Sequence, residues 1–209
     1  MNSLSEAVAY YKVYDADNRE FVGIASVDLP ELTKPSVDLK GSGIIGNISA
    51  PIELAFDSMT ATLNFRTISV SAIQFIAPGK KSFVLVMLNQ ETDISTLNPE
   101  FKGYRILLEG KSKSVKLGSI DTGEATNSTC EMEVYHIKVT ENSVDVLEIS
   151  KLGNIFKING VNYMDLITEG LLNGGNVTFA SLTNAINQAN GILNGASSIV
   201  SQAGGIVGG

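Results

Sequence analysis

A long stretch near the start of the chain separates two groups of predicted strands. Residues 21–29 are rich in Val, Ile and Phe and predict a strand, and residues 52–55 and 61–65 predict two more. Between these groups runs a segment punctuated by Gly and Pro, longer than an ordinary connection in a compact domain. Connections of this length more often carry an interaction than act as filler. The sequence therefore predicts an arm between two strands.

Residues 41–46 of this arm spell G-x-G-x-x-G, the pattern of a dinucleotide-binding turn. That turn needs a strand before it, a helix after it and an acidic residue about twenty positions further on. Here a polar run precedes the pattern, Pro51 interrupts the expected helix, and Arg66 stands at the acidic position. We therefore interpret the glycines as bends of the arm, and Ile44 and Ile45 as an apolar tip that buries against something else.

Most of the remaining chain is predicted to be strand, with one short helix. Apolar and β-branched runs separated by turn residues predict strands at 7–14, 82–88, 104–116, 130–140, 144–149 and 155–158. The run at 82–88 is continuous enough to be buried on both faces. Residues 90–103 and 118–128 are predicted to be polar loops. The helix is expected at residues 70–77, where Val70, Ile73 and Ile76 recur at helical spacing before a Pro-Gly stop.

The composition changes at residue 170, because residues 170–209 contain no Asp, Glu, Lys or Arg. Gly191 and Gly195 would each weaken a helix there by about 1 kcal/mol relative to alanine. We expect such a helix to form by docking an apolar stripe on another surface; a disordered tail is the alternative. The chain is accordingly divided into a β domain (1–169) and an uncharged Gly/Asn-rich extension (170–209). The stripe consists of Leu182, Ile186, Ala189, Leu193, Ala196 and Val200.

The charge balance excludes one large class of function. A net charge of −7 argues against nucleic-acid binding that depends on neutralising phosphates. Only 18% of residues are charged, and a surface short of charge is often covered by partners. The single Cys130 fits a reducing compartment, and no secretory signal is visible. No apolar run of about eighteen residues is present, so we expect no membrane span.

The side chains that could carry chemistry form no convincing catalytic or metal-binding pattern. Residues 79–82 resemble part of a phosphate-binding loop, but its first glycine is replaced by Gln74. The turn at residues 15–18 lacks the later glycine and the closing glutamate of a calcium loop. The single His136 is interpreted as a hydrogen-bonded strand histidine, because neither a nucleophile nor a group of carboxylates accompanies it. We predict no enzyme, no catalytic residue, no cofactor and no metal.

Several segments, in this order, resemble the major tail tube protein of contractile-tailed bacteriophages and of phage-tail-like bacteriocins. They are residues 22–33 (VGIASVDLPELT), 41–54 (GSGIIGNISAPIEL), 121–124 (DTGE), 147–149 (LEI) and 156–162 (FKINGVN). The similarity runs from about residue 7 to about residue 170. The loop at 90–103 is longer than the family leads us to expect, and residues 171–209 extend past the family's usual end.

The resemblance implies a mainly β fold: an antiparallel sandwich or barrel-like subunit with one short flanking helix, a long inter-strand arm and a C-terminal helical extension. It further implies homohexameric rings that stack into a hollow tube inside a contractile sheath, located in the virion and assembled in the bacterial host cytoplasm. The lumen would be a continuous β-barrel to which every subunit lends strands. The implied partners are other copies of the chain, the tail sheath protein, the tape measure protein, the baseplate and tail-terminator proteins, and DNA that passes without specific binding.

The resemblance also gives roles to the two unusual segments. The arm would reach the next ring, and the C-terminal stripe would dock on the tube exterior, on a neighbouring subunit or under the sheath. Two alternatives remain: the tube of a contractile bacteriocin or secretion device without a genome, and a stand-alone ligand-binding β-barrel with an apolar pocket. The residues expected to form the inter-ring arm are Leu32, Val37, Leu39, Gly41, Gly43, Ile44, Ile45, Gly46 and Ile48.

Overall fold

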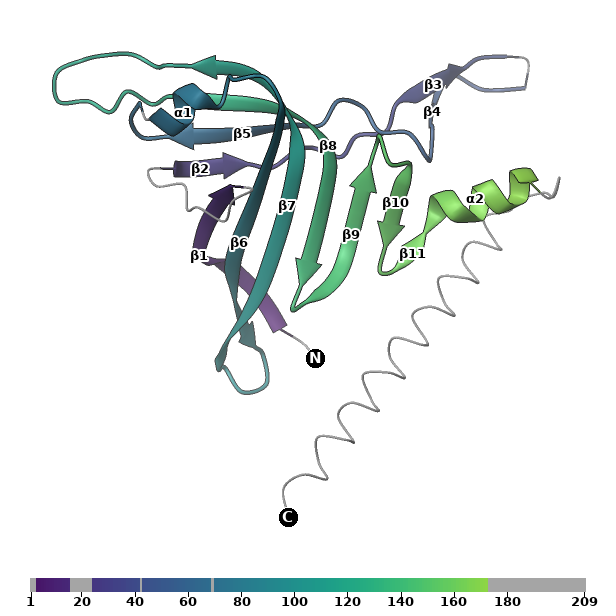
Figure 1. Ribbon diagram of the computed structural model, residues 1–209. Helices are drawn as coiled ribbons and strands as arrows, with labels where there is room; N and C mark the ends of the chain where they lie inside the picture. The colour runs from purple at the N-terminus through teal and green to yellow at the C-terminus, as the bar shows by residue number, and fades with distance from the viewer. Residues whose placement is uncertain (1–2, 16–23, 42, 69, 173–209) are drawn as a thin grey trace.

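The computed structural model describes residues 3–15, 24–41, 43–68 and 70–172 (Figure 1). This part of the chain is mainly antiparallel β, which confirms the predicted fold class. The helices are α1 (Val70–Gln74) and α2 (Tyr163–Leu172). The strands are β1 (Ser3–Asp15), β2 (Ile24–Asp28), β3 (Ser36–Leu39), β4 (Ile48–Pro51), β5 (Thr60–Phe65), β6 (Lys80–Asp93), β7 (Pro99–Lys116), β8 (Thr129–Glu141), β9 (Val144–Ser150), β10 (Ile155–Ile158) and β11 (Val161–Asn162).

The main sheet runs in the order β1-β6-β7-β8-β9-β10-β11 and divides at β8. One edge of β8 pairs with β7 along its length, whereas the other pairs with β5 near its start and with β9 near its end. Strand β2 pairs with β5, so both lie across the end of the long strands (Figure 1). The Tyr11 hydroxyl donates to the carbonyl oxygen of Ala25 over 3.0 Å, which links β1 to β2 as the sheet curls.

The core fills the concave side of this curled sheet. Strand β5 and the first half of β8 alternate strictly between buried and half-buried residues, as expected for strands with one face inward. Helix α1 covers one end, where the Phe75 ring stacks on Phe83 at 5.5 Å. Each fully buried large apolar side chain contributes about 1.5–3 kcal/mol. The core residues that are fully buried include Val13, Met59, Leu63, Phe65, Leu108, Cys130, Met132 and Val134.

The predicted helix is shorter than expected and turns its other face inward. Helix α1 ends at Gln74, and residues 75–77 continue as turns. The predicted apolar stripe was wrong, because Val70, Ile73 and Ile76 are exposed while Ala72 and Phe75 are buried. Both faces of this segment are apolar, so the spacing pattern alone could not select the buried one.

A predicted strand and a predicted loop were also placed wrongly. Residues 52–55 were predicted to be a strand but contain a turn, and the strand lies just before them as β4. The predicted loop at 90–103 is largely strand, since β6 and β7 continue to pair until Thr92 lies opposite Pro99, leaving only residues 94–98 as loop. The run at 82–88 is fully buried only at residues 83–85, because Val86 and Leu88 face outward.

Helix α2 was not predicted, and it runs across the proposed domain boundary at residue 170. Its first residue is anchored by stacking of the Tyr163 ring on Phe156 at 5.1 Å, and Phe156 in turn meets Phe56 edge-on at 5.0 Å. The division into 1–169 and 170–209 stays a prediction, and the stripe at residues 182–200 lies outside the described residues. Within the described ranges, neither helix has the length and apolar character required to span a membrane.

Candidate functional site

The predicted arm contains a β-hairpin that stands apart from the main sheet. Strands β3 and β4 pair only with each other, with Val37 opposite Ala50 and Leu39 opposite Ile48. Figure 1 shows this hairpin projecting beside the body of the molecule. Its turn passes through Gly43 and Gly46, whose φ angles of 93° and 94° lie in the region that favours glycine. The glycines thus serve as bends, as the sequence indicated.

The hairpin exposes the apolar side chains predicted to contact a neighbour. Leu32 precedes the hairpin, Val37 and Leu39 lie on β3, Ile48 lies on β4, and all four are exposed. In the turn between them, Ile45 is fully exposed and Ile44 is half-buried. A two-stranded hairpin is at best marginally stable alone in water. An isolated hairpin with an apolar surface is therefore suited to being covered by another chain.

The two legs of the arm are joined to each other at the base of the hairpin. The backbone N–H of Ile52 donates to the carbonyl oxygen of Pro35 over 2.8 Å, and that of Asp57 donates to the carbonyl oxygen of Thr33 over 2.9 Å. An ion pair between Lys34 and Glu53 closes the same base. The Phe56 ring then meets Phe156 of β10 edge-on at 5.0 Å, which anchors this leg on the main sheet and limits the entropy lost when the arm binds.

A second feature is a row of ion pairs and histidine hydrogen bonds across five strands, on the face of the sheet away from the core. Lys80 Nζ on β6 lies 2.8 Å from Glu109 Oε1 on β7, and Glu109 Oε2 lies 3.0 Å from His136 Nδ1 on β8. His136 Nε2 lies 3.2 Å from Glu148 Oε1 on β9. The row ends where Glu148 Oε2 lies 3.7 Å from Lys157 Nζ on β10. We call these five residues the ion-pair row.

The ion-pair row confirms that His136 is a hydrogen-bonded strand histidine and corrects the view that no carboxylates accompany it. Burial raises the pKa of Glu109, but hydrogen bonds from Lys80 and His136 outweigh this and hold that pKa below its ordinary value of 4.5. Sequence reasoning missed the carboxylates because they come from neighbouring strands rather than from residues near His136 in sequence.

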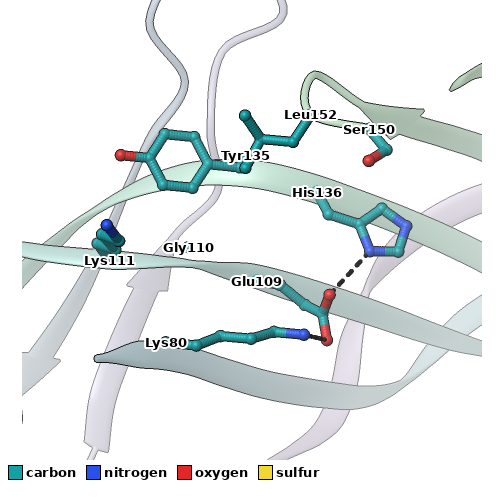
Figure 2. A pocket seen from close by; sticks show the side chains of 8 residues that line it. All are labelled: Lys80, Glu109, Gly110, Lys111, Tyr135, His136, Ser150 and Leu152. Carbon is teal, nitrogen blue, oxygen red and sulfur yellow. Dashed lines mark hydrogen bonds and ion pairs between the residues drawn. The ribbon is translucent and has the colours of Figure 1, made fainter. Parts of the chain in front are cut away.

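A hollow of about 490 Å³ lies beside the ion-pair row, lined by Lys80, Lys111, Tyr135, His136 and Leu152 among others (Figure 2). Its lining contains no cysteine nucleophile; the chain's one thiol, Cys130, is buried elsewhere, and burial raises its pKa to about 11. Among the described residues, no group of three His, Cys, Asp or Glu side chains is placed to hold a metal ion. The hollow is a surface depression lined by charged and polar side chains, Ser150 among them, together with Leu152.

Acidification tests the ion-pair row. Because the pKa of Glu109 is lowered on folding, its stabilising contribution is present above about pH 4.5 and is lost as pH falls through the lower folded value. Glu109→Gln is expected to destabilise the subunit by about 1 kcal/mol at pH 6, and by progressively less as the pH falls through the lowered pKa of Glu109, where the wild type loses the same charge. Thermal midpoints of both proteins across this range measure the difference; a constant difference would contradict the assignment.

A third feature is the edge of β1, the strand that begins the order of the main sheet among the described residues. This strand is 13 residues long and exposes Leu4, Val8 and Tyr10. Long apolar edge strands readily pair with another chain unless charge, proline or a covering element protects them. The edge of β1 is thus a second surface, besides the arm, that favours assembly.

The family model described as phage tail tube protein FII matches residues 5–171. The chain belongs to this family of structural proteins, and it is therefore a tail tube protein and not an enzyme. This membership confirms the resemblance found in the sequence. No curated protein matches the chain.

Similar solved structures come from contractile injection systems, at low identity. The sheath/tube terminator of the extracellular system PVC has 12% identity, covers 66% of this chain and 97% of its own, and has a TM-score of 0.45. The tube-terminating cap of the anti-feeding prophage has 14% identity, coverages of 65% and 94%, and a TM-score of 0.43. The PVC sheath–tube complex has 13% identity, coverages of 64% and 90%, and a TM-score of 0.41. The assignment above depends on the family match alone.

Proposed function

We propose that this chain is the repeating subunit of a contractile tail tube, in which six copies form a ring and rings stack into a hollow tube that conducts DNA. The observation that carries the proposal is the β3–β4 hairpin, an anchored apolar projection that contributes nothing to the subunit's own core. Membership of the tail tube family supplies the context in which such a projection has a use.

The proposed ring closes through sheet edges. Identical head-to-tail contacts generate a closed ring when the rotation between copies permits it. The exposed edge of β1 offers one side of that contact, and joining edges removes the hazard of unpaired backbone groups. The β3–β4 hairpin would then contact the adjacent ring, with Ile44 and Ile45 at its tip.

The remaining partners follow from the same proposal. The outside of the tube would contact the tail sheath, its ends the baseplate and the tail terminator, and its lumen the tape measure protein and then DNA. The net charge of −7 per copy suits a conduit, because carboxylates facing the lumen would repel phosphate and keep DNA from adhering. We place the assembled protein in the virion tail, with assembly in the bacterial cytoplasm.

Membership of the tail tube family disfavours the alternative of a stand-alone ligand-binding barrel. That alternative also gives no use to the projecting β3–β4 hairpin with its exposed apolar side chains.

Negative-stain electron microscopy of the purified chain tests the proposal. We expect rings or tubes with an axial hole at micromolar concentrations, because both assembly surfaces are exposed in the subunit. Light scattering across a dilution series should show cooperative growth above a threshold concentration. A monomer at all concentrations, with neither rings nor tubes, would overturn the proposal.

A further inference from the structure

The β6–β7 hairpin ends in a loop at the end of the sheet far from the arm (Figure 1). Strand β1 accompanies β6 as far as Asp93, so only the loop at residues 94–98 extends past the paired strands. Strand β8 stops pairing with β7 at Tyr104, so the first residues of β7, up to Gly103, pair with β6 alone. We call residues 93–101 the distal tip. Nothing in the sequence analysis assigned a role to this segment, which was predicted to be a polar loop.

The distal tip is apolar where it is exposed. Leu97 is 77% exposed, and Ile94 and Phe101 are each 58% exposed. The charged residues just below it are paired, since Lys102 Nζ lies 2.6 Å from the buried carboxylate of Glu91. Exposed apolar side chains that gather on one projecting element indicate a contact surface more strongly than the same residues scattered singly.

The loop of the distal tip is held in one conformation by Asp93. Its Oδ1 accepts hydrogen bonds from the backbone N–H groups of Ser95 at 2.7 Å and Thr96 at 3.1 Å. The Asp93 carbonyl oxygen also accepts from the N–H of Leu97 at 2.8 Å. Leu97 itself has a φ of 57°, in the left-handed region, where asparagine or glycine is more favourable than leucine. The subunit's own fold therefore gains nothing from an exposed leucine at this position.

We infer that the distal tip packs against a second copy of this chain in the adjacent ring, an inference that rests on the proposed function. In a stack of identical rings, the surface at one end of each copy meets the opposite end of the next copy. The arm and the distal tip lie at opposite ends of the long strands (Figure 1), so stacking brings one toward the other. Each presents apolar side chains that are exposed within the part of the chain that the structure describes.

The charge distribution supports a second copy as the occupant. Every copy is acidic, with a net charge of −7, so two copies repel one another unless they meet through neutral surfaces. Residues 41–52 of the arm contain no Asp, Glu, Lys or Arg, and the distal tip carries only Asp93 and Glu100 at the two ends of an uncharged segment, residues 94–99. The Asp93 carboxylate is held by the backbone N–H groups of Ser95 and Thr96. Contact through residues 94–99 therefore brings apolar side chains together with few like charges.

Leu97→Asn tests the inference without endangering the fold, because asparagine tolerates the left-handed backbone better than leucine does. We expect a thermal midpoint equal to or above that of the wild type, rings that still form, and a threshold concentration for tubes raised about tenfold or more through loss of a buried leucine. Ile120→Asn is the matched control, since Ile120 is also largely exposed, on a different loop, and it should assemble as the wild type does.

The possible outcomes separate this inference from the proposed function. If Leu97→Asn forms tubes as readily as the wild type does, the inference is refuted and the proposed function stands. A variant that stays monomeric would place the distal tip within the ring, and normal tubes that no longer bind sheath would place it under the sheath; either result overturns the inference. A wild-type chain that forms no tubes refutes the proposed function and this inference together.

Discussion

Replacing both Ile44 and Ile45 with aspartate is expected to leave the subunit folded and to abolish the stacking of rings. Ile45 is fully exposed and Ile44 half-buried in the subunit, so two carboxylates at the hairpin tip cost the isolated fold little. Between two rings the same carboxylates would be buried without partners, at a cost of several kcal/mol each. Circular dichroism should match the wild type, while electron microscopy should show single rings instead of tubes.

The control for this variant is Ile120→Asp, which places a new charge on another exposed loop. It should stack normally, because the expected effect belongs to the arm and not to added negative charge. Normal tubes from the Ile44/Ile45 double variant would show that the hairpin tip is not an inter-ring contact. Loss of rings as well as tubes would place the hairpin in contacts within the ring.

Gly110→Ala is expected to be the most damaging single-methyl change in the sheet. Strand β7 shifts register against β8 between Glu109 and Gly110, and a Cβ at 110 would lie only 1.9 Å from the carbonyl oxygen of Glu133. That oxygen belongs to the backbone of β8, so no side-chain rotation can relieve the clash. We expect a loss of about 3 kcal/mol or more, beyond the usual range for overpacking.

Gly103→Ala on the same strand is the matched control. The nearest atoms to its added Cβ are Leu88 Cδ2 at 3.9 Å and Asn142 Oδ1 at 4.0 Å, which is ordinary contact distance. Its stability should stay within about 0.5 kcal/mol of the wild type, as for most surface substitutions. Urea unfolding of both variants provides the comparison, and equal stabilities would contradict the close approach at Gly110.

The sequence predicted strands well where one face of the strand is buried. Residues 61–65 and 130–134 alternate between buried and half-buried positions, and the predicted bounds of both strands differ from β5 and β8 by a single residue at each misplaced end. The far ends of β6 and β7 were missed because their residues are mostly polar, and the buried Glu91 is paired with Lys102 rather than packed in an apolar core. Such a strand has no hydrophobic period to detect. Strands β3 and β4 were missed because the bends of a Gly-rich arm hide a pairing of only four residues.

The candidate surfaces differ in how far they could be foreseen. The exposed arm follows from local features, namely its length, its glycines and two adjacent isoleucines. The ion-pair row does not, because Glu109 and His136 are 27 residues apart and meet only in one strand register. The register shift beside Gly110 determines that Glu109 lies opposite His136. No local sequence pattern reveals this register shift. The distal tip depends likewise on a φ angle that a leucine rarely adopts.

The pairing of β1 with β6 has a consequence for how the protein is made. Asp15 pairs with Phe83 and Ser3 with Asp93, so β1 meets its partner only after β6 has been synthesised. At translation rates of about 5–20 residues per second, that interval lasts roughly 4–15 s. Neighbouring ribosomes on one message expose the same apolar strand during this time. Nascent chains held close together therefore compete with the correct fold for β1, and spacing or chaperone binding during synthesis becomes a condition for obtaining subunits that can assemble.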